Sequence, residues 1–188
     1  KNNWLHSLEI QTRFLSKNIE NHLMGNHLFA NAKALIFAGL FFDGEEAKRW
    51  YVEGCNILKR ELSEQILPDG GNFELSPMYH IIFLEDLLDL VNIHRAYSYE
   101  LPDKLEKNVQ PMFSWLLTMC HPDGEISFFN DAALDITPSV EEIQNYGQKL
   151  GLIKSLGDLE GKSSLTKLES SGYCRVELDN LVTLIDRS

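Results

Sequence analysis

Basic residues are scarce in this sequence. Its 17 lysines and arginines are outnumbered by 28 aspartates and glutamates, which gives a net charge of -11. Proteins that bind nucleic acids or anionic membranes do so through clustered positive charge. The sequence supplies no such cluster, so both kinds of partner are poor hypotheses.

Long apolar runs and paired cysteines are also missing. The longest apolar stretch, Leu28 to Phe42, contains Lys33 and is shorter than the roughly 20 residues that cross a bilayer. The three cysteines, Cys55, Cys120 and Cys174, have neither metal-like nor redox-like spacing, so packing is their expected role. The histidines are scattered. We therefore expect no membrane span, no metal and no cofactor.

The first residues, Lys1 to Trp4, contain neither a start methionine nor a signal peptide. We expect the chain to begin inside a longer protein, so any targeting signal would lie outside it.

Apolar residues recur at helical spacing through residues 1–154. The predicted helices cover about 4–21, 28–42, 45–66, 77–97, 102–120 and 139–150. Helices 28–42 and 77–97 have no polar face, which indicates that they lie inside a larger helical array, whereas 45–66 is amphipathic and belongs outside. Ser76-Pro77 indicates a capping residue followed by proline at the first helical position.

The pattern changes after residue 154. Residues 155–171 are rich in Ser, Gly and Lys and suggest a linker. Residues 173–178 and 181–185 favour strands and flank Asp179-Asn180, which predicts a hairpin. Helices followed by strands favour two domains. Two short strands do not form a stable sheet alone, so the second domain is expected to continue beyond the chain.

Polar residues gather at three places, all at ends of predicted helices. The first is Asn21-His22 with Asn26-His27, and the second is Glu74 to His80. The third is His121 to Gly124 with Phe129 to Asp131. Helix N-termini have free N–H groups and the positive end of the helix dipole, so the first two places suit a carboxylate.

Each cluster also has a purely structural explanation. Asn26 could cap its helix, with His27 a satisfied polar neighbour, and spacing alone favours this explanation. Tyr79 and His80 fall in a first helical turn, where exposure is ordinary. Asn130-Asp131 could form a turn or a cap.

The order of these clusters is more specific than any one of them. Asn26 to Leu35, then Trp50 in a long helix, then Gln65 to His80 resembles the helical domain of the heparinase II/III-like family. The match extends over roughly residues 20–131, and Leu67 to His80 is its most diagnostic part. The resemblance implies a mainly α fold. Residues 1–154 would form part of an incomplete (α/α) toroid, 155–171 a linker, and 172–188 the first strands of a truncated antiparallel β-sandwich.

Lyases of this family cleave uronic-acid-containing polysaccharides by β-elimination. The proton at C5 of the uronate is only slightly acidic while the carboxylate keeps its charge, so the site must neutralise the carboxylate. The resemblance implies Asn26 for this task, His27 as a helper, and Tyr79 as the general acid and base.

The resemblance also implies substrate-binding or supporting residues, namely His80, Glu74, Asn130 and Asp131. A further catalytic histidine is expected in the β-sandwich, and the sequence has none after His121. The 188-residue chain alone is therefore expected to bind acidic saccharide weakly and not to cleave it.

The expected partner is an acidic polysaccharide, and the acidic balance favours a sparsely charged or unsulfated one. The resemblance suggests bacterial surface-polysaccharide metabolism and the periplasm rather than the cytoplasm. The first alternative is a catalytically silent relative that binds carbohydrate or assists polysaccharide assembly. A helical-repeat interaction protein is a further alternative, but the helices have no regular repeat length.

Overall fold

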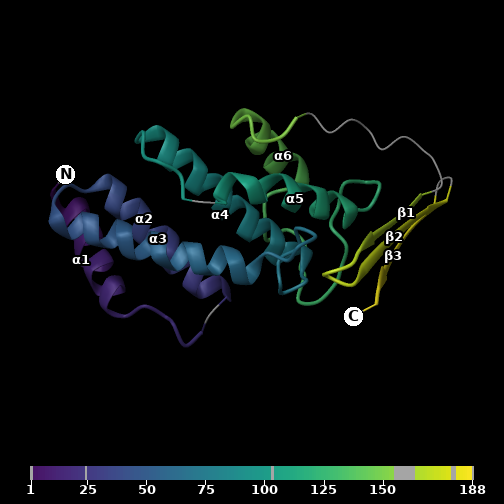
Figure 1. The fold of residues 1–188 in the computed structure, drawn as a ribbon, viewed down its shortest axis with the longest axis horizontal. Coiled ribbons are helices and arrows are strands. Elements are labelled where there is room, and N and C mark those ends of the chain that lie inside the picture. Colours follow the sequence, from purple (N-terminus) through teal and green to yellow (C-terminus); the bar gives the residue numbers. More distant parts are fainter. Residues whose placement is uncertain (1, 24, 103, 155–163, 179–180, 188) are drawn as a thin grey trace. The chain divides into compact units, whose positions relative to one another are not determined.

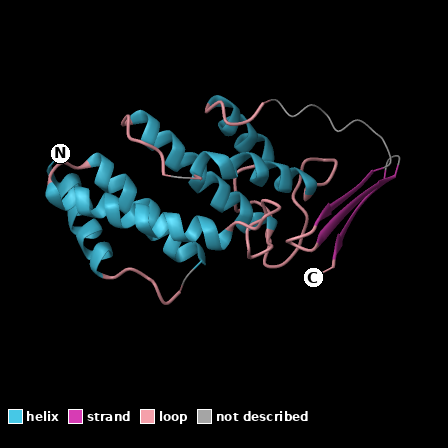
Figure 2. Cartoon of the chain, in the orientation of Figure 1, coloured by secondary structure: helices cyan, strands magenta, loops and turns pink. Residues whose placement is uncertain are grey.

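The computed structural model describes residues 2–23, 25–102, 104–154, 164–178 and 181–187 (Figure 1). Helices make up most of this described part, and its strands form one sheet near the C-terminus (Figure 2). The helices are α1 (Asn2–Lys17), α2 (Gly25–Phe41), α3 (Glu45–Gln65), α4 (Pro77–Ala96), α5 (Leu105–Thr118) and α6 (Val140–Lys149). The strands are β1 (Ser164–Leu168), β2 (Tyr173–Leu178) and β3 (Leu181–Asp186). The predicted mainly α chain with strands at its end is confirmed.

The chain divides into two compact units. The first unit is Lys1–Glu64 with Asp89–Asp103, and the second is Gln65–Leu88 with Lys104–Ser188. The sheet belongs to the second unit, together with α5 and α6, so this division does not fall at the boundary expected near residue 172. Leu168 and Tyr173 are the reason, since both side chains are buried in one cluster with Trp115 and Met119. A separate β-sandwich domain beginning at residue 172 stays a prediction.

Helix α2 provides much of the core of the first unit. Its buried residues are Leu28, Phe29, Asn31, Ala32, Leu35, Ile36, Ala38, Gly39 and Leu40. A Cβ on Gly39 would lie 2.6 Å from the Cβ of Tyr51 in α3, so glycine lets these two helices approach closely. Helix α3 buries Trp50 and Leu58 but exposes Lys48 and Arg49. The prediction of a buried helix beside an amphipathic one is confirmed.

Helix α4 is also buried, as its lack of a polar face predicts. Met78, Ile81, Leu84 and Leu87 are among its fully or nearly fully buried residues. The helix begins at Pro77, and the carbonyl of Ser76 accepts a hydrogen bond from the His80 N–H at 2.9 Å. This is the predicted start, with proline where a helix needs no N–H donor. None of the described helices is long and apolar enough to cross a membrane.

The sheet is antiparallel in the order β1-β2-β3. The pairing of β2 with β3 confirms the predicted hairpin strands, while its turn residues, Asp179-Asn180, lie outside the described part. Strand β1 occupies Ser164–Leu168, which is part of the segment expected to be a linker, and the linker itself stays a prediction. Only Leu168 of this strand is buried. The strand therefore lacks the alternation of apolar and polar residues from which it could have been predicted. Residues 155–163 of the expected linker lie outside the described part.

Candidate functional site

Two of the expected site residues lie in the first turn of α2. The helix begins at Gly25, whose φ of 54° lets the chain turn into the helix. Asn26 follows and is half-buried, while the His27 side chain is 65% exposed and its Nδ1 lies 3.9 Å from Glu20 Oε2. The predicted position at the N-terminus of a buried helix is confirmed for both residues.

The side-chain amide of Asn31 stabilises this first turn through hydrogen bonds. The sequence analysis assigned Asn31 no role. Its Oδ1 accepts a hydrogen bond from the Glu20 N–H at 3.1 Å. Its Nδ2 donates to Glu20 Oε2 at 2.9 Å and to the His27 carbonyl at 2.8 Å. The amide therefore ties the segment before α2 to the first turn of the helix. The available signal was an amide inside the almost entirely apolar stretch from Leu28 to Phe42, because a buried polar side chain requires partners.

The loop between α3 and α4 contains the predicted turn Pro68 to Gly71. Asp69 Oδ1 accepts a hydrogen bond from the Gly71 N–H at 3.2 Å. Gly70 has a φ of 90°, and a Cβ there would lie 2.3 Å from the carbonyl oxygen of Pro111. Only glycine fits this position, because it tolerates positive φ and leaves room for the α5 backbone. The turn is therefore packed directly on α5.

His80 is completely buried beneath this loop. Its Nδ1 accepts a hydrogen bond from the Asn72 N–H at 3.2 Å, and its Nε2 lies 3.0 Å from the Met112 carbonyl, to which it donates. The ring stacks on Trp115 with centroids 4.4 Å apart. Both ring nitrogens are used within the protein. Of the two roles expected for His80, support of its neighbours fits this geometry and direct substrate binding does not.

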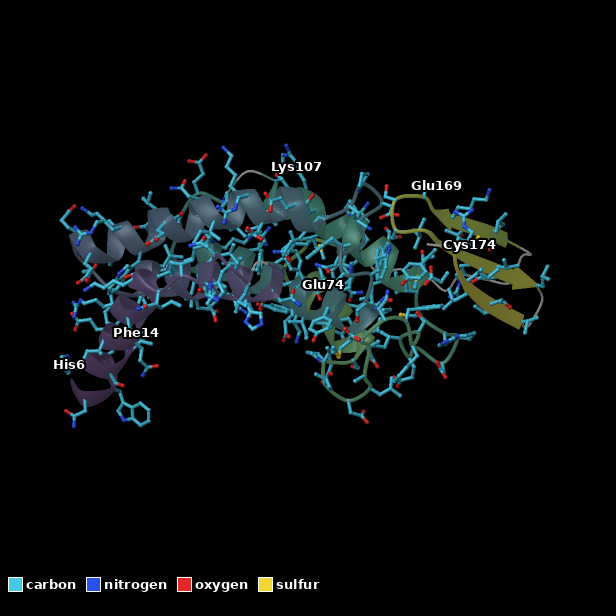
Figure 3. All side chains as sticks on the ribbon, turned by 90° about the horizontal axis from the view of Figure 1, so that it is seen from below. His6, Phe14, Glu74, Lys107, Glu169 and Cys174 are labelled. Carbon is cyan, nitrogen blue, oxygen red and sulfur yellow. The ribbon has the colours of Figure 1, made fainter. Side chains whose placement is uncertain are left out.

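Tyr79 and Glu74 are more accessible than His80. Tyr79 is half-buried in the first turn of α4, and its N–H lies 3.5 Å from Ser76 Oγ. Glu74 is also half-buried, on the loop before the helix (Figure 3). Its N–H donates to Asn72 Oδ1 at 3.0 Å. A half-buried phenol in the first turn of α4 and a half-buried carboxylate on the preceding loop are thus near in sequence to the buried histidine.

Asn130 is joined to the same loop. Its Nδ2 donates to the Leu75 carbonyl and to the Tyr173 hydroxyl, each at 3.0 Å. The Tyr173 hydroxyl donates in turn to the Leu75 carbonyl at 2.7 Å. Asp131, the next residue, is exposed. The sequence predicted Asn130 as a site residue but gave Tyr173 no role beyond a strand, because nothing local links it to residue 75.

The structure therefore brings Glu74, Tyr79, His80 and Asn130 together in the second unit. Asn26 and His27 belong to the first unit. That both sets surround one sugar stays a prediction, and a structure with a bound oligosaccharide would test it.

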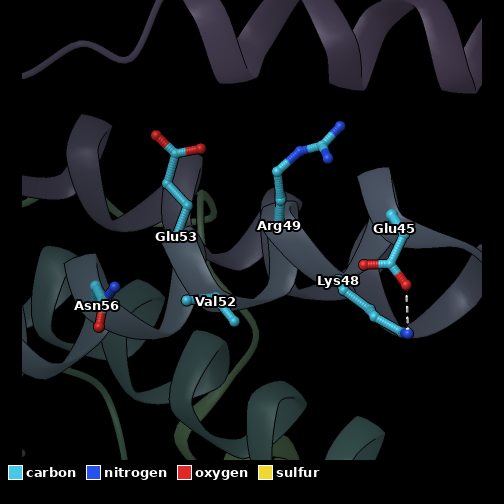
Figure 4. Close-up of a pocket in the computed structure, with 6 residues that line it drawn as sticks. All are labelled: Glu45, Lys48, Arg49, Val52, Glu53 and Asn56. Carbon is cyan, nitrogen blue, oxygen red and sulfur yellow. Dashed lines mark hydrogen bonds and ion pairs between the residues drawn. The ribbon is translucent and has the colours of Figure 1, made fainter.

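A surface hollow of about 320 Å³ lies on α3 (Figure 4). Its lining residues are Glu45, Lys48, Arg49, Val52, Glu53 and Asn56. All come from one exposed side of one helix, and the pair of Glu45 with Lys48 at 2.7 Å is a surface ion pair. No predicted site residue lines this hollow, and we assign it no function.

Metal-ligand groups are also not found in the described part of the chain, where no three His, Cys, Asp or Glu side chains are placed to share an ion. The cysteines are free thiols, and Cys120 and Cys174 are buried.

The burial of His80 makes stability depend on pH. Burial lowers its pKa to about 4 from an ordinary value of 6.5, although the Met112 carbonyl and Asp69 oppose the shift. Between these two pKa values, the His80 imidazole is therefore mostly neutral in the folded chain and mostly protonated in the unfolded chain. This contribution is complete above pH 6.5 and is lost as the pH falls toward 4. We expect it to remove about 2 kcal/mol of the free energy of unfolding between about pH 7 and about pH 4.5.

Urea denaturation of the wild type and His80→Gln at both pH values measures this effect. The two proteins differ only at residue 80, so a difference between their losses of stability is assigned to His80. The variant is expected to be less stable at pH 7 and to lose less stability on acidification. Parallel losses in the two proteins would show that His80 is not the group responsible.

The family description "Heparinase II/III N-terminus" matches residues 2–151 of this chain. A heparin-sulfate lyase of Bacteroides stercoris is 34% identical over 125 residues, which are 65% of this chain and 18% of that protein. A heparin-sulfate lyase of Pedobacter heparinus is 29% identical over 132 residues, which are 69% of this chain and 20% of that protein. The chain thus spans about a fifth of the length of these curated relatives.

Solved structures show the same fold. A crystal structure of heparinase III superimposes with a TM-score of 0.82 at 19% identity, over 98% of this chain and 32% of that one. A second heparinase III structure gives a TM-score of 0.73 at 25% identity, over 92% of this chain and 29% of that one. These likenesses confirm the expected fold class. Because the family match extends over most of the chain, this chain belongs to the heparinase II/III family.

Proposed function

We propose that the protein is a polysaccharide lyase that cleaves a uronic-acid-containing polysaccharide by β-elimination. The observation that carries the proposal is the position of Asn26 and Tyr79, each in the first turn of a buried helix. Such turns combine N–H donors with the positive end of a helix dipole, which suits a substrate carboxylate. The relatives named heparin-sulfate lyase support the same reaction class.

The Asn26 amide would donate a hydrogen bond to the uronate carboxylate, assisted by His27. Neutralising that charge stabilises the enolate-like intermediate that forms when C5 loses its proton. Tyr79, as the phenolate, would take the C5 proton. The C4–O4 bond then breaks, a C4–C5 double bond forms, and Tyr79 returns the proton to the leaving oxygen. Atoms and charge balance, because one group acts first as base and then as acid.

The charges around the second-unit loop favour a sparsely sulfated substrate. Glu74 and Asp131 are acidic. The buried guanidinium of Arg175 is already paired with Glu177 at 2.6 Å and hydrogen-bonded to the carbonyls of Thr118 and Cys120. It is therefore not available to a sulfate group. The names of the relatives point to a heparin-type substrate, so the degree of sulfation is the property to vary.

The test is an assay of the complete gene product, with any residues that flank this chain, on heparin, heparan sulfate and unsulfated uronate polysaccharides. Absorbance of the unsaturated uronate product measures the rate. We expect turnover that is faster on sparsely sulfated or unsulfated chains. Binding without turnover on the whole panel would contradict the proposal and favour the silent relative.

A role in bacterial surface-polysaccharide metabolism stays a prediction within this proposal.

A further inference from the structure

We propose that Tyr173 is a positioning residue for Tyr79. Its hydroxyl, together with the Asn130 amide, holds Leu75 in a left-handed backbone conformation that sets the start of α4. This inference rests on the proposed role of Tyr79, and its structural part can be tested separately.

The first step is the backbone at Leu75. Its φ is 58°, a region that a branched apolar side chain rarely adopts. Such a conformation persists only where surrounding contacts determine it. Here the Leu75 carbonyl accepts hydrogen bonds from the Tyr173 hydroxyl at 2.7 Å and from Asn130 Nδ2 at 3.0 Å. The two donors are also bonded to each other at 3.0 Å, which fixes the direction of both.

The second step leads from Leu75 to Tyr79. Leu75 directly precedes Ser76, whose Oγ lies 3.5 Å from the Tyr79 N–H. The Ser76 carbonyl accepts from the His80 N–H at 2.9 Å and so begins the helix. A rotation at Leu75 would redirect this first turn and the phenol on it. Catalysis is sensitive to such shifts, because a displacement of about 1 Å costs about 100-fold in rate.

The third step concerns how firmly Tyr173 is itself held. Its side chain is fully buried, with its ring edge-on to Trp115 at 6.0 Å and tilted against Phe129 at 5.0 Å. Burial raises the pKa of its phenol to about 12, so the hydroxyl remains a donor at neutral pH.

The turn between β1 and β2 is hydrogen-bonded to the same loop. The Ser171 N–H and Oγ donate to Asp69 Oδ2 at 2.7 and 2.9 Å. Trp115 Nε1 donates to Ser171 Oγ at 2.9 Å. The sheet thus holds the loop at two points, Asp69 and Leu75, and Tyr173 can act as a fixed anchor.

The test is Tyr173→Phe in the complete gene product, which removes the hydroxyl and keeps the ring packing. We expect several-fold faster hydrogen exchange in peptides covering residues 72–80. We also expect kcat to fall on the order of 10- to 100-fold with KM nearly unchanged. Adding Leu75→Asn should restore part of kcat, because asparagine tolerates the left-handed region better than leucine. A merely structural role would give no such rescue.

Tyr51→Phe is the matched control. It removes the hydroxyl of a tyrosine in the first unit that bonds to Cys55, and both readouts should stay at wild-type values. Unchanged exchange in Tyr173→Phe would overturn the inference. Faster exchange with unchanged kcat would refute the catalytic part. If the wild type cleaves nothing while exchange rises, the proposed function fails but the hold on Leu75 stands.

Discussion

Replacing Tyr79 with phenylalanine in the complete gene product is expected to lower kcat about 10²–10⁴-fold, because only the proton-transferring hydroxyl is lost. KM should remain nearly unchanged, since the ring and the first turn of α4 stay in place. Formation of unsaturated uronate on a substrate that the wild type cleaves gives both constants.

Tyr97→Phe is a suitable control for this experiment. Tyr97 follows α4 and is exposed, and it has no expected part in the site. Its variant should match the wild type. Wild-type turnover by Tyr79→Phe would show that Tyr79 is not the acid or base.

Asn26 should give the second largest effect. Asn26→Ala removes one donor to the substrate carboxylate, and loss of such a donor costs about 10²–10³-fold in kcat. Asn26→Asp keeps the size of the side chain but adds a negative charge facing a negative substrate. We expect it to raise KM as well as lower kcat. The same product assay measures both variants.

The folding of both Asn26 variants must be checked, because Asn26 lies in the first turn of α2. Thermal unfolding should show a loss no larger than the ~0.5–2 kcal/mol typical of a capping residue. Asn56→Ala, on the exposed side of α3, is the matched control, and its turnover and thermal unfolding should equal those of the wild type. Equal turnover in Asn26→Asp and the wild type would remove Asn26 from the mechanism.

Local patterns were sufficient to predict most of the fold. Helices α2 and α4 have no polar face, and their burial follows directly from that. Ser76-Pro77 marked the start of α4 because capping and proline geometry act within one turn. Strand β1 could not be predicted in this way. Four of its five residues are exposed, and it is a strand because β2 pairs with it.

The candidate site was predictable only where its residues are near each other in sequence. The positions of Asn26 and Tyr79 in first helical turns came from local signals. The burial of His80 did not, because a first turn is usually exposed and the covering ring of Trp115 comes from α5. The contacts of Ser171 and Tyr173 with the loop link positions 102 and 98 residues apart, beyond the reach of periodicity or motif spacing.

Those separations also bear on the order in which the molecule is built. Helices form from neighbouring residues, whereas contacts between distant positions must first close a long loop, so they form late. Since synthesis proceeds from the N-terminus, α4 emerges from the ribosome well before Ser171 and Tyr173 exist. Until then the loop lacks the hydrogen bonds that Ser171 makes to Asp69 and that Tyr173 makes to Leu75. Leu75 therefore lacks the contact with the sheet that stabilises its unfavourable φ. The start of α4 is thus among the last parts of this chain to be fixed, although Leu75 and Tyr79 lie in its first half.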